Sequence, residues 1–64
     1  MFSVGDKVLY CRYDETIGTE RFVKCTVTSV FYEDGDPVQG VNLVNDKTGE
    51  VIGGVDSQSC IFRK

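Results

Sequence analysis

The chain consists of short segments in which apolar and polar residues alternate, separated by turn sequences. From Lys7 to Tyr13, alternate residues would lie on opposite faces of a strand, and each face contains apolar residues. This pattern is typical of a strand covered on each side or lying in a small closed barrel. A polar loop follows over residues 14–20. A longer strand is then predicted from Arg21 to about Tyr32, because apolar side chains recur there with a period of two, at Val23, Cys25 and Val27.

The alternation of this second strand breaks at residues 29–32, where Val30, Phe31 and Tyr32 follow one another. One extra residue in a strand exchanges its two faces, so this break predicts a bulge near Ser29. Residues 33–37 then form a turn, because Asp-Gly supplies a positive φ angle and proline cannot donate to a ladder.

A β-hairpin is predicted after this turn. Residues 41–45 and 50–52 form its strands, and residues 46–49 connect them with Gly49 in the left-handed conformation. The predicted register places Val44 beside Val51, Leu43 beside Ile52, and Val41 across from Gly54.

The end of the chain is predicted to close the sheet. Gly53 and Gly54 weaken a strand unless another group crosses closely, so they predict a tightly coiled barrel corner. Residues 56–59 have the capping chemistry of a single helical turn, and residues 60–62 form a short last strand.

Composition supports an all-β class. The chain has 64 residues, with no alanine and two leucines, against ten valines, three isoleucines and five threonines. These residues favour a pleated surface over a helix. The length allows one domain, residues 1–64, with a core of about a dozen side chains, and the start methionine predicts a complete small polypeptide.

The order of these elements resembles the SH3-like small barrels, and within them the Tudor-like and KOW-like members. The opening residues 2–8 look like the usual entry to the first strand, and residues 54–62 look like the final turn and strand. The resemblance implies a five-stranded, strongly bent barrel with one short 3-10 turn before the last strand. Such barrels bind peptides, modified side chains, nucleic acid or other subunits, and the fold alone does not choose among these.

The charge of the chain favours a neutral or basic partner. Ten acidic and seven basic residues give a net charge of −3, and the basic residues are scattered, which disfavours a simple grip on nucleic acid. Arg63 and Lys64, the one adjacent basic pair, are predicted to form a frayed, solubilising tail. No apolar run approaches the length of a membrane span, and no secretory leader is recognised, so a cytoplasmic protein is expected.

The sequence carries few groups suited to catalysis or metal binding. It has no histidine, and its carboxylates are predicted in solvated loops, so we expect no enzyme and no catalytic residues. Cys11, Cys25 and Cys60 are an odd, widely spaced set, which predicts reduced and mostly buried thiols instead of a zinc site or a disulfide framework. No metal and no cofactor are expected.

Aromatic and acidic residues together are the remaining candidate for a binding site. In the Tudor-like barrels the loop after the first strand and the turn after the second form an aromatic cage for methylated lysine or arginine. Here each region offers a ring beside an acid, although packing in the core or at its rim is the favoured role for the rings. The predicted partner-binding residues are Tyr13, Asp14, Glu15, Tyr32, Glu33, Asp34 and Asp36.

These observations predict a non-catalytic binding module that engages a larger protein. Its contact surface is expected to join residues 13–20 with residues 32–36, and its size is typical of viral or mobile-element accessory factors. The rival hypothesis is a binder of single-stranded nucleic acid that stacks bases on Tyr10, Phe22 and Tyr32. Addition of a partner strand to an open sheet edge and homo-oligomerisation are left open.

Overall fold

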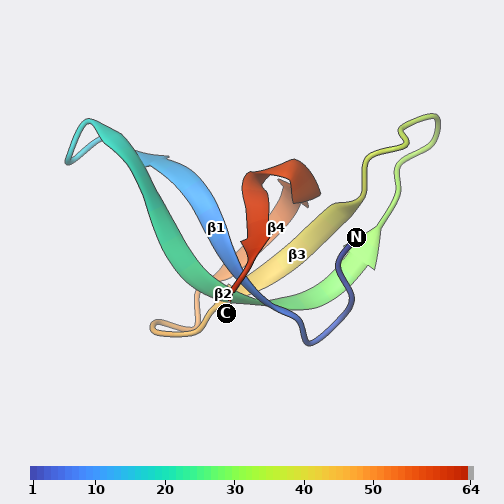
Figure 1. Cartoon of the computed structure of the whole chain (residues 1–64), viewed down its shortest axis with the longest axis horizontal. Helices are drawn as coiled ribbons and strands as arrows, with labels where there is room; N and C mark the ends of the chain where they lie inside the picture. Colours follow the sequence, from blue (N-terminus) through green and yellow to red (C-terminus); the bar gives the residue numbers. More distant parts are fainter. Residues whose placement is uncertain (64) are drawn as a thin grey trace.

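The chain folds into one antiparallel sheet of five strands, which confirms the all-β prediction (Figure 1). The computed structural model describes residues 1–63. The strands are β1 (Lys7–Asp14), β2 (Thr19–Phe31), β3 (Gly40–Asn45), β4 (Val51–Asp56) and β5 (Cys60–Phe62), with a 3-10 turn η1 (Ser57–Ser59) between the last two. Their order across the sheet is β4-β3-β2-β1-β5.

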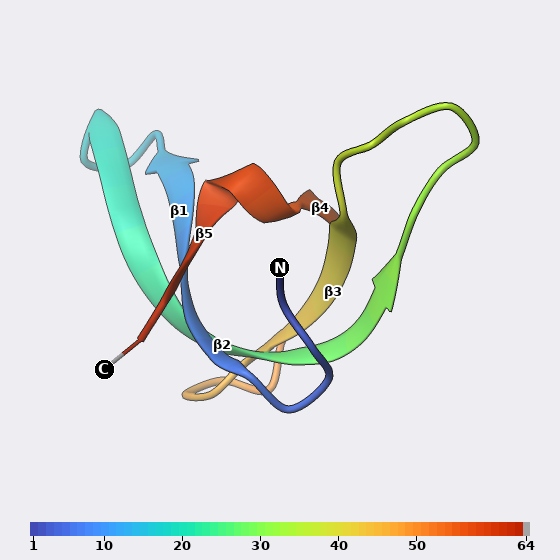
Figure 2. The same cartoon turned by 45° about the vertical axis from the view of Figure 1, so that its right-hand side comes forward.

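The sheet is strongly bent but is not closed into a barrel. Figure 2 shows β1 and β2 curving upwards on one side and β3 on the other, with η1 crossing between them. Over residues 1–63 no ladder joins the edge strands β4 and β5. The expected strong bend is therefore present, whereas the two edges are connected by the 3-10 turn and not by backbone pairing.

The core lies on the concave side of this bend and consists of small apolar residues. Side chains from β1, β2 and β3 are fully or almost fully buried, and Phe2, Val55 and Cys60 complete the cluster. The predicted inward face of β2 is confirmed, with Cys25 and Val27 buried and Val23 packed against the core. The most deeply buried side chains are Val8, Cys25, Val27, Val41 and Leu43.

The predicted bulge near Ser29 is confirmed. The register between β2 and β3 shifts between Val27 and Ser29, which leaves Thr28 as the extra residue. A bulge exchanges the two faces of a strand and increases its local twist. It therefore explains why apolar side chains stop alternating at this point, and it contributes to the bend of the sheet.

The β3–β4 hairpin follows the predicted register for its first two pairs only. Val44 pairs with Val51 and Leu43 with Ile52, but Val41 pairs with Val55 and not with Gly54. Two glycines therefore oppose the single residue Asn42, in a second bulge that the sequence prediction missed. Gly54 has a φ of +68°, and this left-handed conformation is the reason for a glycine there.

Among residues 1–63 no other group crosses closely over this glycine pair. A Cβ atom on Gly53 would meet only Asn42 Oδ1 at 3.5 Å, which is an ordinary contact, and one on Gly54 would meet nothing. Close approach occurs instead at Gly40, where the ring of Phe31 occupies the space of a Cβ atom.

Asn42 holds the two bulges together. Its Nδ2 donates to Ser29 Oγ at 2.6 Å on one side, and its Oδ1 accepts from the Gly54 N–H at 2.9 Å on the other. The hydroxyl of Thr28 donates to the Asn42 carbonyl at 3.1 Å. The half-buried Asn42 side chain therefore gives hydrogen-bond partners to Ser29 at the first bulge and to Gly54 at the second, where the regular pairing of the strands is interrupted.

Both ends of the chain are tied to the sheet. Gln39 is buried and bonds Phe2 twice, accepting from its N–H and donating to its carbonyl, each at 2.8 Å. Arg63 donates its backbone N–H to Lys7 O at 3.0 Å, and its guanidinium contacts Asp46 Oδ2 at 2.6 Å. The prediction of a frayed tail was therefore wrong for Arg63, because these partners fix it, and Lys64 lies outside the described residues.

The predicted helical turn and last strand are confirmed. Asp56 Oδ1 accepts from the Gln58 N–H at 2.8 Å and caps η1. β5 then pairs with β1, with Cys60 opposite Tyr10 and Phe62 opposite Val8.

Candidate functional site

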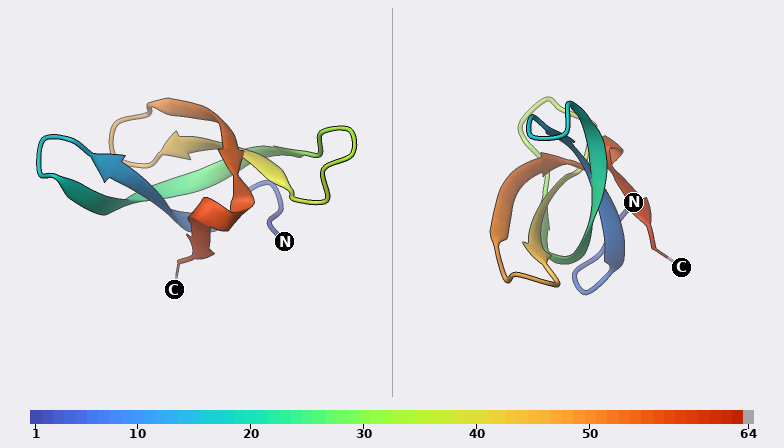
Figure 3. Two further views of the ribbon diagram at one scale, coloured as in Figure 1. Left: turned by 90° about the horizontal axis from the view of Figure 1, so that it is seen from above. Right: turned by 90° about the vertical axis from the view of Figure 1, so that its left-hand side faces the viewer.

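The structure does not bring the two halves of the predicted contact surface together. Figure 3 shows the β1–β2 loop and the β2–β3 loop at opposite ends of the long axis, along which the molecule extends 35 Å. The reason is the length of β2, whose 13 residues separate the loops at about 3.3 Å per residue. Tyr13, Asp14 and Glu15 therefore lie at one end, and Tyr32, Glu33, Asp34 and Asp36 lie at the other.

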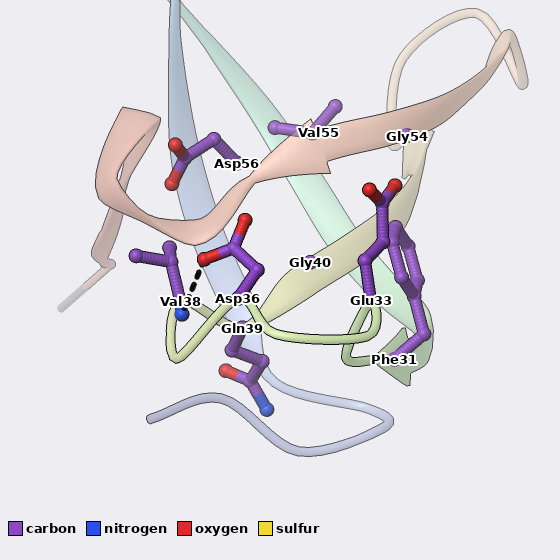
Figure 4. Close-up of a pocket in the computed structure, with 9 residues that line it drawn as sticks. All are labelled: Phe31, Glu33, Asp36, Val38, Gln39, Gly40, Gly54, Val55 and Asp56. Atoms are coloured by element: carbon purple, nitrogen blue, oxygen red, sulfur yellow. Dashed lines mark hydrogen bonds between the residues drawn. The ribbon is translucent and has the colours of Figure 1, made fainter.

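A small pocket with acidic walls lies at the end that holds the β2–β3 loop. It has a volume of about 120 Å³. Glu33 and Asp36 come from the loop, Asp56 comes from the end of β4, and the ring of Phe31 forms part of the wall (Figure 4). We call this site the acidic pocket; the other residues lining it are Val38, Gln39, Gly40, Gly54 and Val55.

Local hydrogen bonds position the carboxylates of the acidic pocket. Asp36 Oδ1 accepts from the Val38 N–H at 2.9 Å, and the Asp36 N–H donates to the Glu33 carbonyl at 3.1 Å, which closes the turn. Asp56 is placed by its cap on η1 and by the pairing of its backbone with Gly40. Two segments about twenty residues apart in sequence are thereby joined at one site.

Within residues 1–63 no cation is paired with the carboxylates of the acidic pocket. Over residues 1–63, the ion pairs involve Asp14, Asp46 and Glu50, and none of the pocket carboxylates. Tyr32 is 52% exposed and Asp34 is also exposed, so a ring and a fourth acid lie in the same loop. The sequence prediction placed Glu33 and Asp36 among the partner-binding residues, counted Phe31 only as one of the aromatic residues flanking the turn, and assigned Asp56 a capping role only.

At the opposite end, Asp14 organises the β1–β2 loop. Its Oδ1 accepts from the Thr16 N–H at 2.9 Å and the Thr16 hydroxyl at 2.5 Å, and its Oδ2 contacts Arg21 Nη1 at 2.9 Å. These bonds to Thr16, and then to Arg21, lower the pKa of Asp14 from 3.8 to about 2. Tyr13 and Glu15 beside it are exposed.

A broad open groove runs between this β1–β2 hairpin and the β3–β4 turn. Its volume is about 940 Å³. Arg12 contacts Glu50 across it at 3.6 Å, while Lys24 and Lys47 form no ion pair among the described residues. We call it the hairpin groove; it is lined by Arg12, Tyr13, Asp14, Glu15, Thr16, Arg21, Phe22, Val23, Lys24, Asn45, Lys47, Thr48 and Glu50.

The aromatic residues do not form one cluster. Tyr10 packs against the core, whereas Tyr13, Phe22 and Tyr32 are at the rim, each more than half exposed. Phe22 lines the hairpin groove and Tyr32 lies at the opposite end, so the rings considered for a cage or for base stacking are not gathered at one site. The aromatic pair in the described part of the chain is Phe2–Phe62, with ring centroids 4.6 Å apart and ring planes tilted by 50°.

The cysteines are free thiols in the structure. Cys25 and Cys60 are buried, as predicted, and burial raises the pKa of both, that of Cys60 to about 11. Cys11 is half-buried and its Sγ donates to Glu20 Oε2 at 3.4 Å. Over residues 1–63, no three His, Cys, Asp or Glu side chains are arranged to hold a metal ion.

No helix in residues 1–63 has the length and apolar character needed to cross a bilayer. Comparisons of the chain with protein-family models, with curated proteins and with solved structures found no match.

Proposed function

We propose that this chain is a non-catalytic binding module that holds a basic segment of a larger protein in the acidic pocket. The observation that carries the proposal is that Glu33, Asp36 and Asp56 line one pocket together with Phe31, with no cation of the described chain paired to them. Three carboxylates at one site favour a partner that supplies positive charge.

The chemistry of the acidic pocket fits the end of a lysine or arginine side chain. The half-buried ring of Phe31 offers an apolar wall to the methylene groups, and a cation near a ring face gains further attraction. Exposed Tyr32 in the same loop adds a residue type that is enriched at the centres of protein interfaces. The partner therefore needs one long basic side chain with neutral or basic neighbours.

The size of the acidic pocket supports binding without catalysis. About 120 Å³ is well below the ~300 Å³ or more typical of small-molecule sites, so it admits one side chain and not a whole substrate. We also propose that this open, strongly bent sheet is a variant of the SH3-like small barrels. Five antiparallel strands, a strong bend and a 3-10 turn before the last strand support this assignment, and the reduced thiols fit a cytoplasmic setting.

Charge-removing variants test the proposed function. The variant Glu33→Gln/Asp36→Asn keeps side chains of the same shape, and Glu15→Gln removes one exposed acid at the other end as its control. Tyr32→Ala and Tyr13→Ala form a second matched pair, because both rings are more than half exposed. The protein is immobilised, partners are captured from the native host and identified by mass spectrometry, and each purified partner is titrated against every variant.

The expected result is a partner that binds the Glu33→Gln/Asp36→Asn variant about tenfold more weakly than the unmodified chain, because charge-assisted contacts are lost. Tyr32→Ala also weakens binding, and neither control does. All variants should unfold at the same temperature within error, since they change exposed residues. A partner that binds all of them equally, or one lost only with Tyr13→Ala, would contradict the proposal.

A further inference from the structure

β2 is much longer than the strand beside it. β3 pairs with the part of β2 from Cys25 to Phe31, whereas residues 19–24 pair with β1 alone. Figure 1 shows this part of β2 rising with β1 as a two-stranded ribbon beyond the end of β3. One edge of β2 is therefore left without a neighbouring strand.

The hydrogen bonds show which backbone groups point to this free edge. Lys24 O accepts from the Asp46 N–H at 3.0 Å on the β3 side, while the Val27 N–H donates to Asp6 O at 2.9 Å on the β1 side. Backbone groups of successive strand residues point in opposite directions. The N–H and C=O groups of Phe22 and Glu20 therefore point away from β1, as those of Lys24 do.

These groups have no partner within residues 1–63. The β2 edge, defined as the backbone of Glu20 and Phe22, offers two donors and two acceptors in the register of the existing β2–β3 ladder. The residues of this part of β2 from Arg21 to Lys24 line the hairpin groove. The free edge thus has open space next to it instead of a covering loop.

We propose that an extended, acidic peptide segment of another protein adds to the β2 edge as an antiparallel strand in line with β3. Addition of a strand to an open edge gains main-chain hydrogen bonds, and side chains at alternate positions give specificity. The proposal concerns the opposite end of the molecule from the acidic pocket, so it is independent of the proposed function.

Charge and apolar surface in the hairpin groove define the peptide. Arg12 is paired with Glu50 and Arg21 with Asp14, whereas Lys24 and Lys47 have no carboxylate partner within residues 1–63. Glu15 also lines the groove without an ion pair, so the two unpaired lysines outnumber the one unpaired acid. Phe22 is 58% exposed beside them. A strand with carboxylates toward the two lysines and an apolar residue against the Phe22 ring satisfies both features.

The other free edges are less suited to receive a strand. The outer edge of β4 is interrupted by the Gly53–Gly54 bulge, and no β4 residue lines the hairpin groove. β5 has only three residues, and the free edge of β1 beyond Tyr10 borders the hairpin groove only through Arg12, Tyr13 and Asp14. The β2 edge combines unpaired backbone, a groove and uncompensated cations. An edge of this kind is normally shielded in proteins that remain alone.

A peptide library tests the proposal although the natural partner is unidentified. A display library of random peptides of about ten residues is selected on the intact protein, with the Phe22→Pro variant as counter-target. Proline removes the outward Phe22 N–H but no hydrogen bond to β1. Phe22→Ala is the matched control, because it removes the ring and keeps the N–H.

We expect enriched peptides in which Asp or Glu alternates with β-branched or aromatic residues. A synthetic copy should bind Lys24→Glu/Lys47→Glu about tenfold more weakly, and a copy N-methylated at alternate amides should bind about fivefold more weakly or worse, because each lost hydrogen bond is costly. When the peptide is bound, exchange of the Glu20 and Phe22 amides should slow, while the Arg21 and Val23 amides, already bonded to β1, change little.

Four outcomes would overturn the proposal. The first is a selection that yields no peptide preferring the intact protein over Phe22→Pro. The second is an N-methylated peptide that binds as well as the parent. The third is amide protection confined to the end that holds the acidic pocket. The fourth is a mixed-sequence single-stranded oligonucleotide that displaces the peptide and binds more tightly, with affinity falling steeply with salt. The amide-exchange readout does not depend on whether Phe22→Pro folds.

Discussion

Replacing Gly40 by alanine places a methyl group where the Phe31 ring now lies. The three heavy atoms nearest to such a Cβ atom all belong to this ring, with Phe31 Cδ2 at 2.9 Å and two ring carbons closer still. Real Cβ atoms do not approach other atoms to this distance, so either the ring or the β3 backbone must move. Gly40 is buried and pairs with Asp56 on the next strand, which limits movement of the backbone.

The expected cost follows from this overpacking. Forcing extra carbon into a packed site costs about 1–3 kcal/mol, which outweighs the gain of ~0.5 kcal/mol from removing glycine from a strand. A domain of this size has only about 3–5 kcal/mol of stability. Gly40→Ala should therefore lose a large part of the free energy of unfolding.

Urea unfolding followed by circular dichroism measures this cost. With a slope of about 1 kcal/mol/M for a small domain, the midpoint should fall by about 1–3 M. Gly53→Ala is the matched control, because its Cβ atom would meet only Asn42 Oδ1 at 3.5 Å. Its midpoint should stay within about 0.5 M of the unmodified protein.

A double-mutant cycle identifies the ring as the cause. Phe31→Ala alone should cost about 2 kcal/mol, because the ring is only half-buried. In that background Gly40→Ala should cost nothing or stabilise slightly, since the atoms it would meet are gone. An equal cost of Gly40→Ala with and without the ring would show that the clash with Phe31 is not the cause.

Three further predictions concern other parts of the molecule. The carboxyl of Asp14 should titrate near pH 2 by NMR, and Thr16→Val should move the midpoint back toward 3.8. Because the folded pKa is lowered, Asp14 contributes stability above its ordinary pKa, and this contribution is lost as the pH falls from 3.8 toward 2; an Asp14→Asn variant with the same acid-unfolding profile would contradict this. Asn42→Ala should lower the free energy of unfolding by about 1–2 kcal/mol, measured with urea, because both bulges lose a hydrogen bond; an unchanged midpoint would show that water replaces the amide. In the native protein a chromogenic disulfide reagent should modify Cys11 slowly and leave Cys60 intact until unfolding, because burial raises the pKa of Cys60 to about 11; rapid reaction of Cys60 would argue against its burial.

The strands could be predicted from the sequence because their signals are local. Alternation of apolar residues located β1 and β2, and the turn residues around Gly49 located the β3–β4 hairpin. The break at Ser29 revealed the first bulge because three bulky residues in a row cannot share one face. The second bulge left no such trace, since Gly53 and Gly54 have no side chains to reveal which face they occupy.

The candidate sites could be predicted only in part. Tyr32, Glu33 and Asp36 were recognised because rings beside acids stand out in a turn. Asp56 enters the same pocket through strand pairing, which depends on the register after the second bulge. Separation of the two loops could not be deduced either, because the resemblance to Tudor-like barrels placed them side by side, whereas the 13 residues of β2 hold them apart.

The order of the strands has a consequence for the assembly of the chain. β1, β2 and β3 each pair with the next strand in sequence, so the four strands from β1 to β4 can pair through short loops at little entropic cost. Only β5 must find a partner from the far end of the polypeptide, as the pairing of Phe62 with Val8 shows. During synthesis, β1 to β4 can therefore form a nearly complete meander before β5 emerges. Residues 60–62 then pair with β1 and complete the sheet.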